Sequence, residues 1–376
     1  MKHKLDFVNE ALEKIKTRNL YRKLQDNHVQ GPYIIFKKKK LVNLCSNDYL
    51  GLGNDKISNK QLQSSSRLVA GNDASFSILE KKLAQHKSQE SALIFPTGYM
   101  ANLGSIPPIT QKGDLILSDE LNHASIIDAC KISGAKIVIY KHNDVADLAK
   151  KIRQKADRKI IVTEGIFSMN GDFAELKKIS EIASKNDSIL VIDDAHGDFV
   201  AGHDGRGSAE YFGVTKKIDV YVSSLSKGLG AFGGYVASRT EINDIIVNTS
   251  RPFIYTSALP SFLVELALQR FSSNREKHRK KLWNNTKMMQ KGLDSIGYTF
   301  NSSSQIIPII IGSEKKAMDF GRYLFNNGVF AQPIRYPTVA IGSARIRISV
   351  TALLDEKNIE KSIDVFESAG KKFGIL

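Results

Sequence analysis

The sequence is poor in cysteine and has no long apolar run. Cys45 and Cys130 are its two cysteines among 376 residues, which excludes a disulfide framework, and they match no metal-ligand spacing. No apolar run approaches the roughly 20 residues of a transmembrane helix. Three acidic residues near the start, Asp6, Glu10 and Glu13, argue against a signal or transit peptide. We therefore expect a cytoplasmic protein without a membrane span or a metal site.

Acidic residues are scarce relative to basic ones. The chain has 39 Asp and Glu against 54 Lys and Arg, a net charge of +15, which suggests a polyanionic partner such as nucleic acid, an acidic membrane or a phosphate-bearing small molecule. The one dense basic run, Lys37 to Lys40, is expected at a hairpin tip, and the other basic residues alternate with acidic ones in helical patterns. We interpret the charge mainly as a solvated surface, and a non-enzymatic nucleic-acid-binding protein stays a remote alternative.

Short apolar runs separated by helical patterns predict the fold. The runs are DLILSD, AKIVIYKH, RKIIVTEG, SILVIDD, IDVYVSS and GGYVAS. Because they are apolar at nearly every position, they predict a mostly parallel sheet covered by helices on both faces, an α/β architecture. Beyond about residue 260, a long helical stretch and two further strands predict a smaller α+β domain. We predict an N-terminal helix and hairpin arm (1–45), a large α/β domain (46–260) and a small C-terminal α+β domain (261–376).

One lysine stands between two apolar strands, in SSLSKGLGAFGG. A solvated lysine in a hairpin turn is the ordinary interpretation of Lys227. GLGAFG also fits the G-x-G-x-x-G pattern, but the strand-like GYVAS follows where a dinucleotide site needs a helix. The remaining hypothesis is a lysine that attacks a carbonyl carbon and forms a Schiff base.

Other polar residues follow neighbouring strands, where ligands bind in open parallel sheets. Asp193 and His196 come after SILVI, and a carboxylate there would keep a bound pyridine nitrogen protonated. His123 heads a helix, with Asn122 as its expected cap, and its imidazole would stack on a flat cofactor. The alternative for each is a helix cap or a turn.

A strand-to-helix turn in PTGYMAN offers a phosphate site. Gly98 and Tyr99 would present free backbone N–H groups at a helix N-terminus, and Ser224 and Ser226 would add hydroxyl donors. Each signal is weak alone, and together they outline a pyridine cofactor with a phosphate.

A series of short segments, spread from residue 46 to 349, carries a family resemblance. They are SNDYLGL, SRLVAGN, FPTGYMANLG, LNHASIIDA, KHND, TEGIFSMNGD, VIDDAHG, SLSKGLGAFGG, FIYTSALP and IRYPTVAIGSARIRIS. In this order they resemble the α-oxoamine synthases, which are fold-type I pyridoxal-phosphate enzymes of the aspartate aminotransferase superfamily. The resemblance implies that fold, pyridoxal 5'-phosphate as cofactor and a homodimer. Departures at Ser64 to Ser66, Phe76, Tyr336, Ala340 and Leu354 leave the acyl-chain specificity open.

The resemblance also implies a role for each matching residue. Arg345 and Arg347 share one face of a strand, so the pattern itself does not choose between them, and the resemblance favours Arg347. The implied set is Lys227 bound to the cofactor, Asp193 at the pyridine nitrogen, His196 and Ser168 on the phenolic-oxygen side, His123 on the ring face, Gly98, Tyr99 and Ser224 at the phosphate with Thr256 from the partner subunit, Arg347 and Asn47 at the amino-acid substrate, and Thr338 and Arg22 at the acyl entrance.

The segment VIDDAHG and the C-terminal ARIRIS region most resemble one branch of the family. That branch condenses L-alanine with a pimeloyl thioester, carried by CoA or by a carrier protein, in biotin synthesis. The same chemistry on glycine with a short acyl-CoA is the near alternative, and a nicotinamide dehydrogenase is a weaker one. The expected partners are an amino acid, an acyl thioester and a second copy of the chain, without nucleic acid or membrane.

Overall fold

The computed structural model describes residues 13–21, 28–36, 39–52 and 65–376. The chain forms two compact units. The large unit comprises Asn47–Ser168 and Asp172–Arg279, and the small unit comprises Met1–Ser46, Met169–Gly171 and Lys280–Leu376. These units differ from the predicted domain ranges in three respects, the first being that Met169–Gly171 belongs to the small unit. The N-terminal segment groups with the C-terminal residues instead of forming a separate arm, and the second boundary lies at Arg279 rather than at residue 260.

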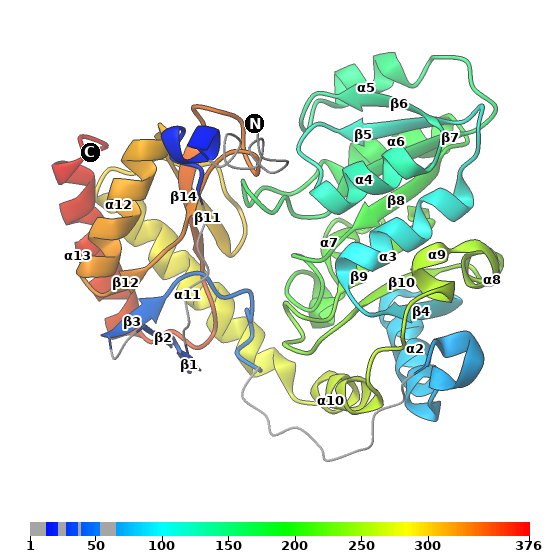
Figure 1. Cartoon of the computed structure of the whole chain (residues 1–376), viewed down its shortest axis with the longest axis horizontal. Coiled ribbons are helices and arrows are strands. Elements are labelled where there is room, and N and C mark those ends of the chain that lie inside the picture. The colour runs from blue at the N-terminus through cyan, green and yellow to red at the C-terminus, as the bar shows by residue number, and fades with distance from the viewer. Residues whose placement is uncertain (1–12, 22–27, 37–38, 53–64) are drawn as a thin grey trace, which may run out of the picture. The chain divides into compact units, whose positions relative to one another are not determined.

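A seven-stranded sheet forms the centre of the large unit (Figure 1). The strand β10 pairs antiparallel with both of its neighbours, β4 and β9, and the other pairs are parallel. The prediction of a mostly parallel sheet is therefore confirmed. In spatial order the strands are β4 (Ser91–Phe95), β10 (Gly234–Ser238), β9 (Val220–Ser224), β8 (Ile189–Asp193), β7 (Lys159–Glu164), β5 (Leu115–Asp119) and β6 (Lys136–Tyr140).

Helices cover both faces of this sheet because successive side chains of each strand point to opposite sides. In β7, Ile161 enters one buried apolar cluster, whereas Ile160 and Val162 enter the other. The cluster with Ile161 includes residues of α2 (Ala74–Lys87), α5 (Val145–Lys151), α6 (Leu176–Lys185) and α10 (Ser261–Phe271). The opposite cluster includes residues of α3 (Gly98–Ser105), α4 (Ala124–Ile132), α8 (Thr240–Thr249) and α9 (Arg251–Ile254), or packs against them. Apolar side chains are thus needed at nearly every strand position, and polar ones remain at the strand ends.

The small unit contains two sheets. One is antiparallel, in the order β11 (Ile306–Gly312), β14 (Ala344–Ser349) and β13 (Pro333–Ile334). The other has the order β1 (His28–Gln30), β2 (Tyr33–Phe36), β3 (Lys39–Asn43) and β12 (Val329–Phe330). The helices are α12 (Glu314–Asn326), α13 (Glu356–Lys372) and most of α11 (Arg275–Ser295), which starts in the large unit.

The predicted N-terminal hairpin is confirmed, since β2 and β3 pair antiparallel. In addition, β3 pairs parallel with β12, and the ring of Phe36 lies 5.5 and 5.0 Å from the rings of Phe325 and Phe330. These contacts explain why the N-terminal strands belong to the small unit. Residues 37–38, at the expected tip, lie outside the described residues, as does most of the predicted first helix. None of the described helices combines the length and the apolar character needed to cross a membrane.

Candidate active site

The loop between β9 and β10 holds Lys227, and a strand follows the glycines, as predicted. The half-buried Lys227 places its Nζ 3.0 Å from Nε2 of His196, a buried residue after β8. On the other side of that ring, Nδ1 lies 2.7 Å from the hydroxyl of Tyr49, which in turn donates to Oδ1 of Asn47 at 3.1 Å. A single direction of donation satisfies all three of these hydrogen bonds. Lys227 donates to Nε2, Nδ1–H donates to the Tyr49 oxygen, and the Tyr49 hydroxyl donates to Asn47.

A second hydrogen-bonded chain joins Asp193 to His123. The buried Asp193, at the end of β8, accepts from Nδ2 of Asn102 at 2.6 Å and from the backbone N–H of Ala195 at 3.0 Å. Asn102 Nδ2 also donates to the hydroxyl of Ser125 at 2.9 Å, and that hydroxyl lies 2.7 Å from Nδ1 of His123. The anionic end of β8 and the exposed imidazole are thus connected through α3 and α4.

His123 caps α4, which corrects the expectation that Asn122 does so. Its Nδ1 accepts from the backbone N–H of Ser125 at 3.2 Å and faces the Ser125 hydroxyl, so Nδ1 is the acceptor and the neutral ring carries its proton on Nε2. Asn122 is buried and donates to the carbonyl of Val162 at 2.8 Å. Partial desolvation and the charge of Lys227 lower the pKa of His123 against the opposing charge of Asp193.

Glu164, at the end of β7, adds an acid that the sequence pattern did not reveal. It is buried, and its Oε2 accepts from the backbone N–H of Ser168 at 3.2 Å. Its Oε1 has no hydrogen-bond partner among the described residues. Burial and the charge of Asp193 raise its pKa well above the ordinary value, despite the opposing charge of Lys227. Burial and the neighbouring Asp193 thus favour the protonated form of Glu164.

The N-terminus of α3 forms a narrow cradle. Thr97 caps the helix by accepting from the backbone N–H of Met100 at 3.1 Å, and the backbone N–H groups of Gly98 and Tyr99 have no acceptor in the described part of the chain. A Cβ placed on Gly98 would lie 3.2 Å from Cβ of Ser224 and 3.6 Å from its Oγ, so this hydroxyl lies beside the helix end. Free N–H groups, a helix dipole and a hydroxyl are what a phosphate needs. The Tyr99 hydroxyl itself donates to Asp128.

These groups fit pyridoxal phosphate. The large unit offers a primary amine for the aldehyde, a buried carboxylate for the pyridine nitrogen and a helix N-terminus for the phosphate. Two features show that the site is polar and close-fitting. The buried Oε1 of Glu164 has no hydrogen-bond partner among the described residues, and a Cβ on Gly98 would narrow the space beside Ser224. The roles of the individual residues stay predictions.

Other predicted site residues lie elsewhere. Thr256, half-buried, follows α9 in the large unit. Thr338 and Arg347 belong to the small unit, and Arg22 lies outside the described residues. Arg347, in β14, is buried and donates to the hydroxyl of Ser349 at 2.7 Å.

The structure distinguishes Arg345 from Arg347. Arg345 donates to Oδ1 of Asn170 at 2.5 Å and to the carbonyl of Met169 at 3.4 Å, both within the small unit. Those bonds hold Arg345 to residues of the small unit, and the role of Arg347 at a substrate carboxylate stays a prediction.

The sequence patterns also indicated no site role for three residues, Tyr49, Asn102 and Ser125. Each lies inside a segment that carries the family resemblance, and that was the one available signal. Their partners are far away in the chain, since Tyr49 contacts a residue 147 positions later and Asn102 one 91 positions later. Among the described residues, no group of three or more His, Cys, Asp or Glu could hold a metal ion.

The fold and the lysine-centred site define a class. Residues 39–366 match the family model for aminotransferases of class I and II, and the chain belongs to this family. It is 41% identical over its full length to a protein of Thermoanaerobacter pseudethanolicus, 99% of which is covered, named 8-amino-7-oxononanoate synthase.

Solved structures resemble the chain over most of its length. A structure described as SPT (serine palmitoyltransferase) with PLP as an internal aldimine matches with a TM-score of 0.92 and 27% identity and covers 99% of both chains. The 8-amino-7-oxononanoate synthase of Francisella tularensis matches with a TM-score of 0.75 and 26% identity over 89% of this chain and 99% of the other. The α/β, fold-type I architecture predicted from the sequence is thereby confirmed.

Proposed function

We propose that this protein condenses L-alanine with a pimeloyl thioester, on CoA or on a carrier protein. The products are 8-amino-7-oxononanoate, CO2 and the free thiol, and the pathway is biotin synthesis. Pyridoxal phosphate is the cofactor. One observation carries the choice of reaction, namely the 41% identity to an 8-amino-7-oxononanoate synthase over the full length of both chains. The site in the large unit supports it with a lysine amine, a buried carboxylate and a phosphate cradle.

When bound, pyridoxal phosphate supplies an electron-withdrawing ring that stabilises negative charge at the Cα of an amino acid. Lys227 would hold the aldehyde carbon and, once released, remove the Cα proton as general base. Asp193 would accept the pyridine N–H, and the bond from Asn102 fixes the orientation of that carboxylate. His196 keeps the Lys227 amine positioned through the 3.0 Å contact. His123 would cover the ring and carry a proton on Nε2 towards the thioester carbonyl.

Arg347 would bind the carboxylate of the amino acid. Its guanidinium offers two parallel donors that match a carboxylate, and the bond to Ser349 restricts its orientation. Asn47 would lie near the same substrate, while Thr338 and Arg22 would line the path of the acyl chain. Losing one charge-assisted bond of this kind costs about 1.5–3 kcal/mol, so Arg347→Lys should raise KM for alanine about tenfold or more.

A substrate panel tests this function. The purified protein, saturated with pyridoxal phosphate, is mixed with alanine, glycine or serine and with pimeloyl-CoA, acetyl-CoA or palmitoyl-CoA. Release of free thiol is then followed. We expect the fastest turnover with alanine and pimeloyl-CoA. Turnover with glycine and acetyl-CoA, but none with alanine and pimeloyl-CoA, would overturn the proposal in favour of 2-amino-3-ketobutyrate CoA ligase activity.

A second candidate is condensation of serine with a long-chain acyl thioester. It is favoured by the TM-score of 0.92 to the serine palmitoyltransferase structure. The sequence favours the first candidate, because identity is 41% to the synthase relative and 27% to that structure. The serine and palmitoyl-CoA arm of the panel separates the two.

The active protein would be a homodimer, with Thr256 reaching the phosphate of the partner's site. Large apolar side chains on the large unit support this assembly, since Tyr255, next to Thr256, is 74% exposed and Val69 is 81% exposed. Cytoplasmic location stays a prediction from the cysteine content and fits the two free thiols, Cys45 and Cys130.

A further inference from the structure

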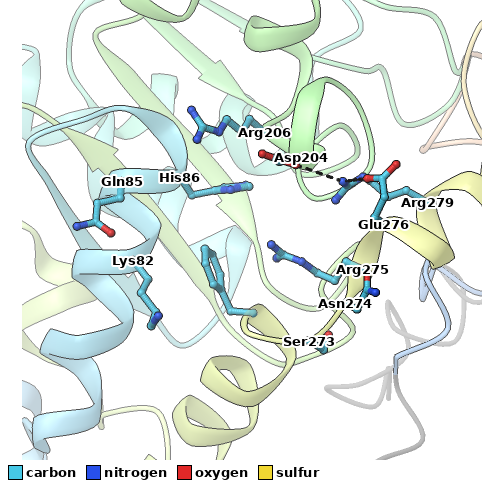
Figure 2. A pocket seen from close by; sticks show the side chains of 11 residues that line it. Lys82, Gln85, His86, Asp204, Arg206, Ser273, Asn274, Arg275, Glu276 and Arg279 are labelled. Atoms are coloured by element: carbon cyan, nitrogen blue, oxygen red, sulfur yellow. Dashed lines mark hydrogen bonds and ion pairs between the residues drawn. The ribbon is translucent and has the colours of Figure 1, made fainter.

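A cavity in the large unit is lined by none of the predicted cofactor or substrate residues. It has a volume of about 400 Å³ and lies between α2, the loop after β8 and the start of α11 (Figure 2). Its lining is Lys82, Gln85, His86, Asp204, Arg206, Phe271, Ser273, Asn274, Arg275, Glu276 and Arg279, all within the large unit.

Positive charge dominates this cavity. Four cationic side chains, Lys82, Arg206, Arg275 and Arg279, face two carboxylates, Asp204 and Glu276, so two positive charges are in excess. The guanidinium of Arg279 is already paired with acidic residues, because it bonds Glu276 and lies 3.9 Å from Asp204. The three remaining cations form no ion pair with an acidic residue in the described ranges.

Burial limits how these cations can be satisfied. Arg275 is half-buried, with its guanidinium carbon 4.7 Å from the ring centre of Phe271 and 5.2 Å from that of Phe199. Its Nη1 is buried and has no hydrogen-bond partner among the described residues. An uncompensated guanidinium in such a place is costly unless an anion approaches it.

Two of the lining residues, His86 and Phe271, are aromatic. His86 stacks on Phe199 at 4.8 Å and meets Phe271 edge-on at 5.5 Å, and its Nε2 donates to the buried Asp198 at 2.9 Å. Burial keeps the pKa of His86 below its ordinary value, so the ring is neutral. The cationic groups are therefore presented around a fixed apolar base.

We propose that this cavity binds a phosphate group, as inorganic phosphate or as part of a phosphorylated small molecule. A phosphate carries about two negative charges near neutral pH, which matches the two excess positive charges, and arginine binds phosphate through paired N–H donors. The site is separate from the predicted cofactor phosphate at α3, so the inference does not depend on the proposed reaction. Its occupant would bridge α2 and the loop after β8 to Arg275, the first residue of α11.

Calorimetric titration tests the site in the full chain saturated with pyridoxal phosphate, in a phosphate-free buffer. The probes are inorganic phosphate, pyrophosphate and ADP, with sodium chloride at matched ionic strength as the salt control. We expect saturable binding of at least one probe, without loss of the cofactor absorbance band. The three probes distinguish a free phosphate from a nucleotide source.

Matched variants locate the binding. Lys82→Gln removes a cavity cation, whereas Lys81→Gln makes the same change on the same helix outside the cavity. The first should raise the dissociation constant about tenfold, and the second should leave it unchanged. Arg206→Gln, at an exposed position, provides a second cavity variant that retains the fold. No binding by any probe, equal binding by the Lys82 and Lys81 variants, or displacement of the cofactor would overturn the proposal.

Discussion

At the residue scale, the candidate site depends on hydrogen bonds that orient its proton-bearing groups. His196 is held from both sides, by Lys227 at 3.0 Å and by Tyr49 at 2.7 Å. His123 is fixed as an acceptor at Nδ1 by Ser125. The sequence predicted His196, Lys227 and His123 as site residues, whereas Tyr49 and Ser125, which orient them, are recognised in the three-dimensional contacts.

The Tyr49 hydroxyl should therefore act as a positioning group. Tyr49→Phe removes the link between His196 and Asn47 and should lower kcat with alanine and pimeloyl-CoA about three- to tenfold, the value of one neutral hydrogen bond. Cofactor occupancy should stay unchanged, while the pH profile of kcat should shift. Tyr211→Phe, at an exposed position, is the control. Equal kinetics and pH profiles for the two variants would contradict the assigned role.

His142 gives a separate, pH-dependent contribution to stability. Its ring bonds Asp119 at 3.0 Å and Asp172 at 2.8 Å. Burial lowers its pKa, but these two carboxylates outweigh burial and raise the pKa to about 10. Because the pKa is raised on folding, the stabilisation is complete below the unfolded value of about 6.5 and is lost as the pH rises through the folded value.

Thermal melting at several pH values measures this contribution. The Tm difference between wild type and His142→Gln should be largest near pH 6 and shrink towards pH 10. The exposed pair of His203 and Asp204 provides a control, since His203→Gln should change Tm little at any pH. A Tm difference for His142→Gln that stays constant across this range would refute the charged state of the ring.

At the element scale, a buried ion network ties α2 to the loop after β8. Lys87 is 1% exposed, and its Nζ lies 3.1 Å from Asp194 and 2.7 Å from Asp198. Asp198 also accepts from Ser223 at 2.7 Å, beside the strand end that leads to Lys227. This network connects the helix to the loop that follows Asp193 and contains His196.

Breaking the network should be costly. Lys87→Met leaves two buried carboxylates without their cation, and we expect a loss of about 3–5 kcal/mol in the free energy of unfolding. Lys81→Met, at an exposed position earlier in the same helix, should change the free energy of unfolding by less than about 0.5 kcal/mol. Chemical denaturation measures the free energy of unfolding of both variants. Equal values would show that the two ion pairs of Lys87 contribute nothing to stability.

Helices and strands were predicted correctly where a pattern within their own residues indicates them. The apolar runs predicted strands of the large unit, and the long helical stretch predicted beyond residue 260 contains α10 (Ser261–Phe271) and α11 (Arg275–Ser295). The pairing of β3 with β12 was not predicted, because partners such as Asn43 and Phe330 lie 287 positions apart in the chain, and such short strands show no periodic pattern that indicates their neighbour. For the same reason the domain ranges predicted from composition differ from the compact units.

At the scale of the whole molecule, the local motifs and the family resemblance predicted the fold and the chemistry together. Two of the excess positive charges lie in the cavity lined by Lys82, Arg206 and Arg275, a placement that composition did not reveal. The place where charged side chains gather depends on which segments, far apart in the sequence, lie side by side in the folded protein.

The assembly of the whole molecule is testable directly. Light scattering on the cofactor-saturated protein should give twice the 41.7 kDa of one chain. The exposed Tyr255 and Val69 supply apolar area for such an interface, so Tyr255→Asp should shift the mass towards that of one chain. A mass of one chain for the wild type at all concentrations would contradict the homodimer and the role of Thr256.

Mass-spectrometric detection of the product formed from L-alanine and pimeloyl-CoA, in the presence of pyridoxal phosphate, tests the proposed condensation. We expect 8-amino-7-oxononanoate to accumulate with the wild type and to be absent with Lys227→Ala, although this variant still binds the cofactor noncovalently. If the cofactor-loaded wild type forms no product, or Lys227→Ala forms an equal amount, the protein does not catalyse this condensation through Lys227.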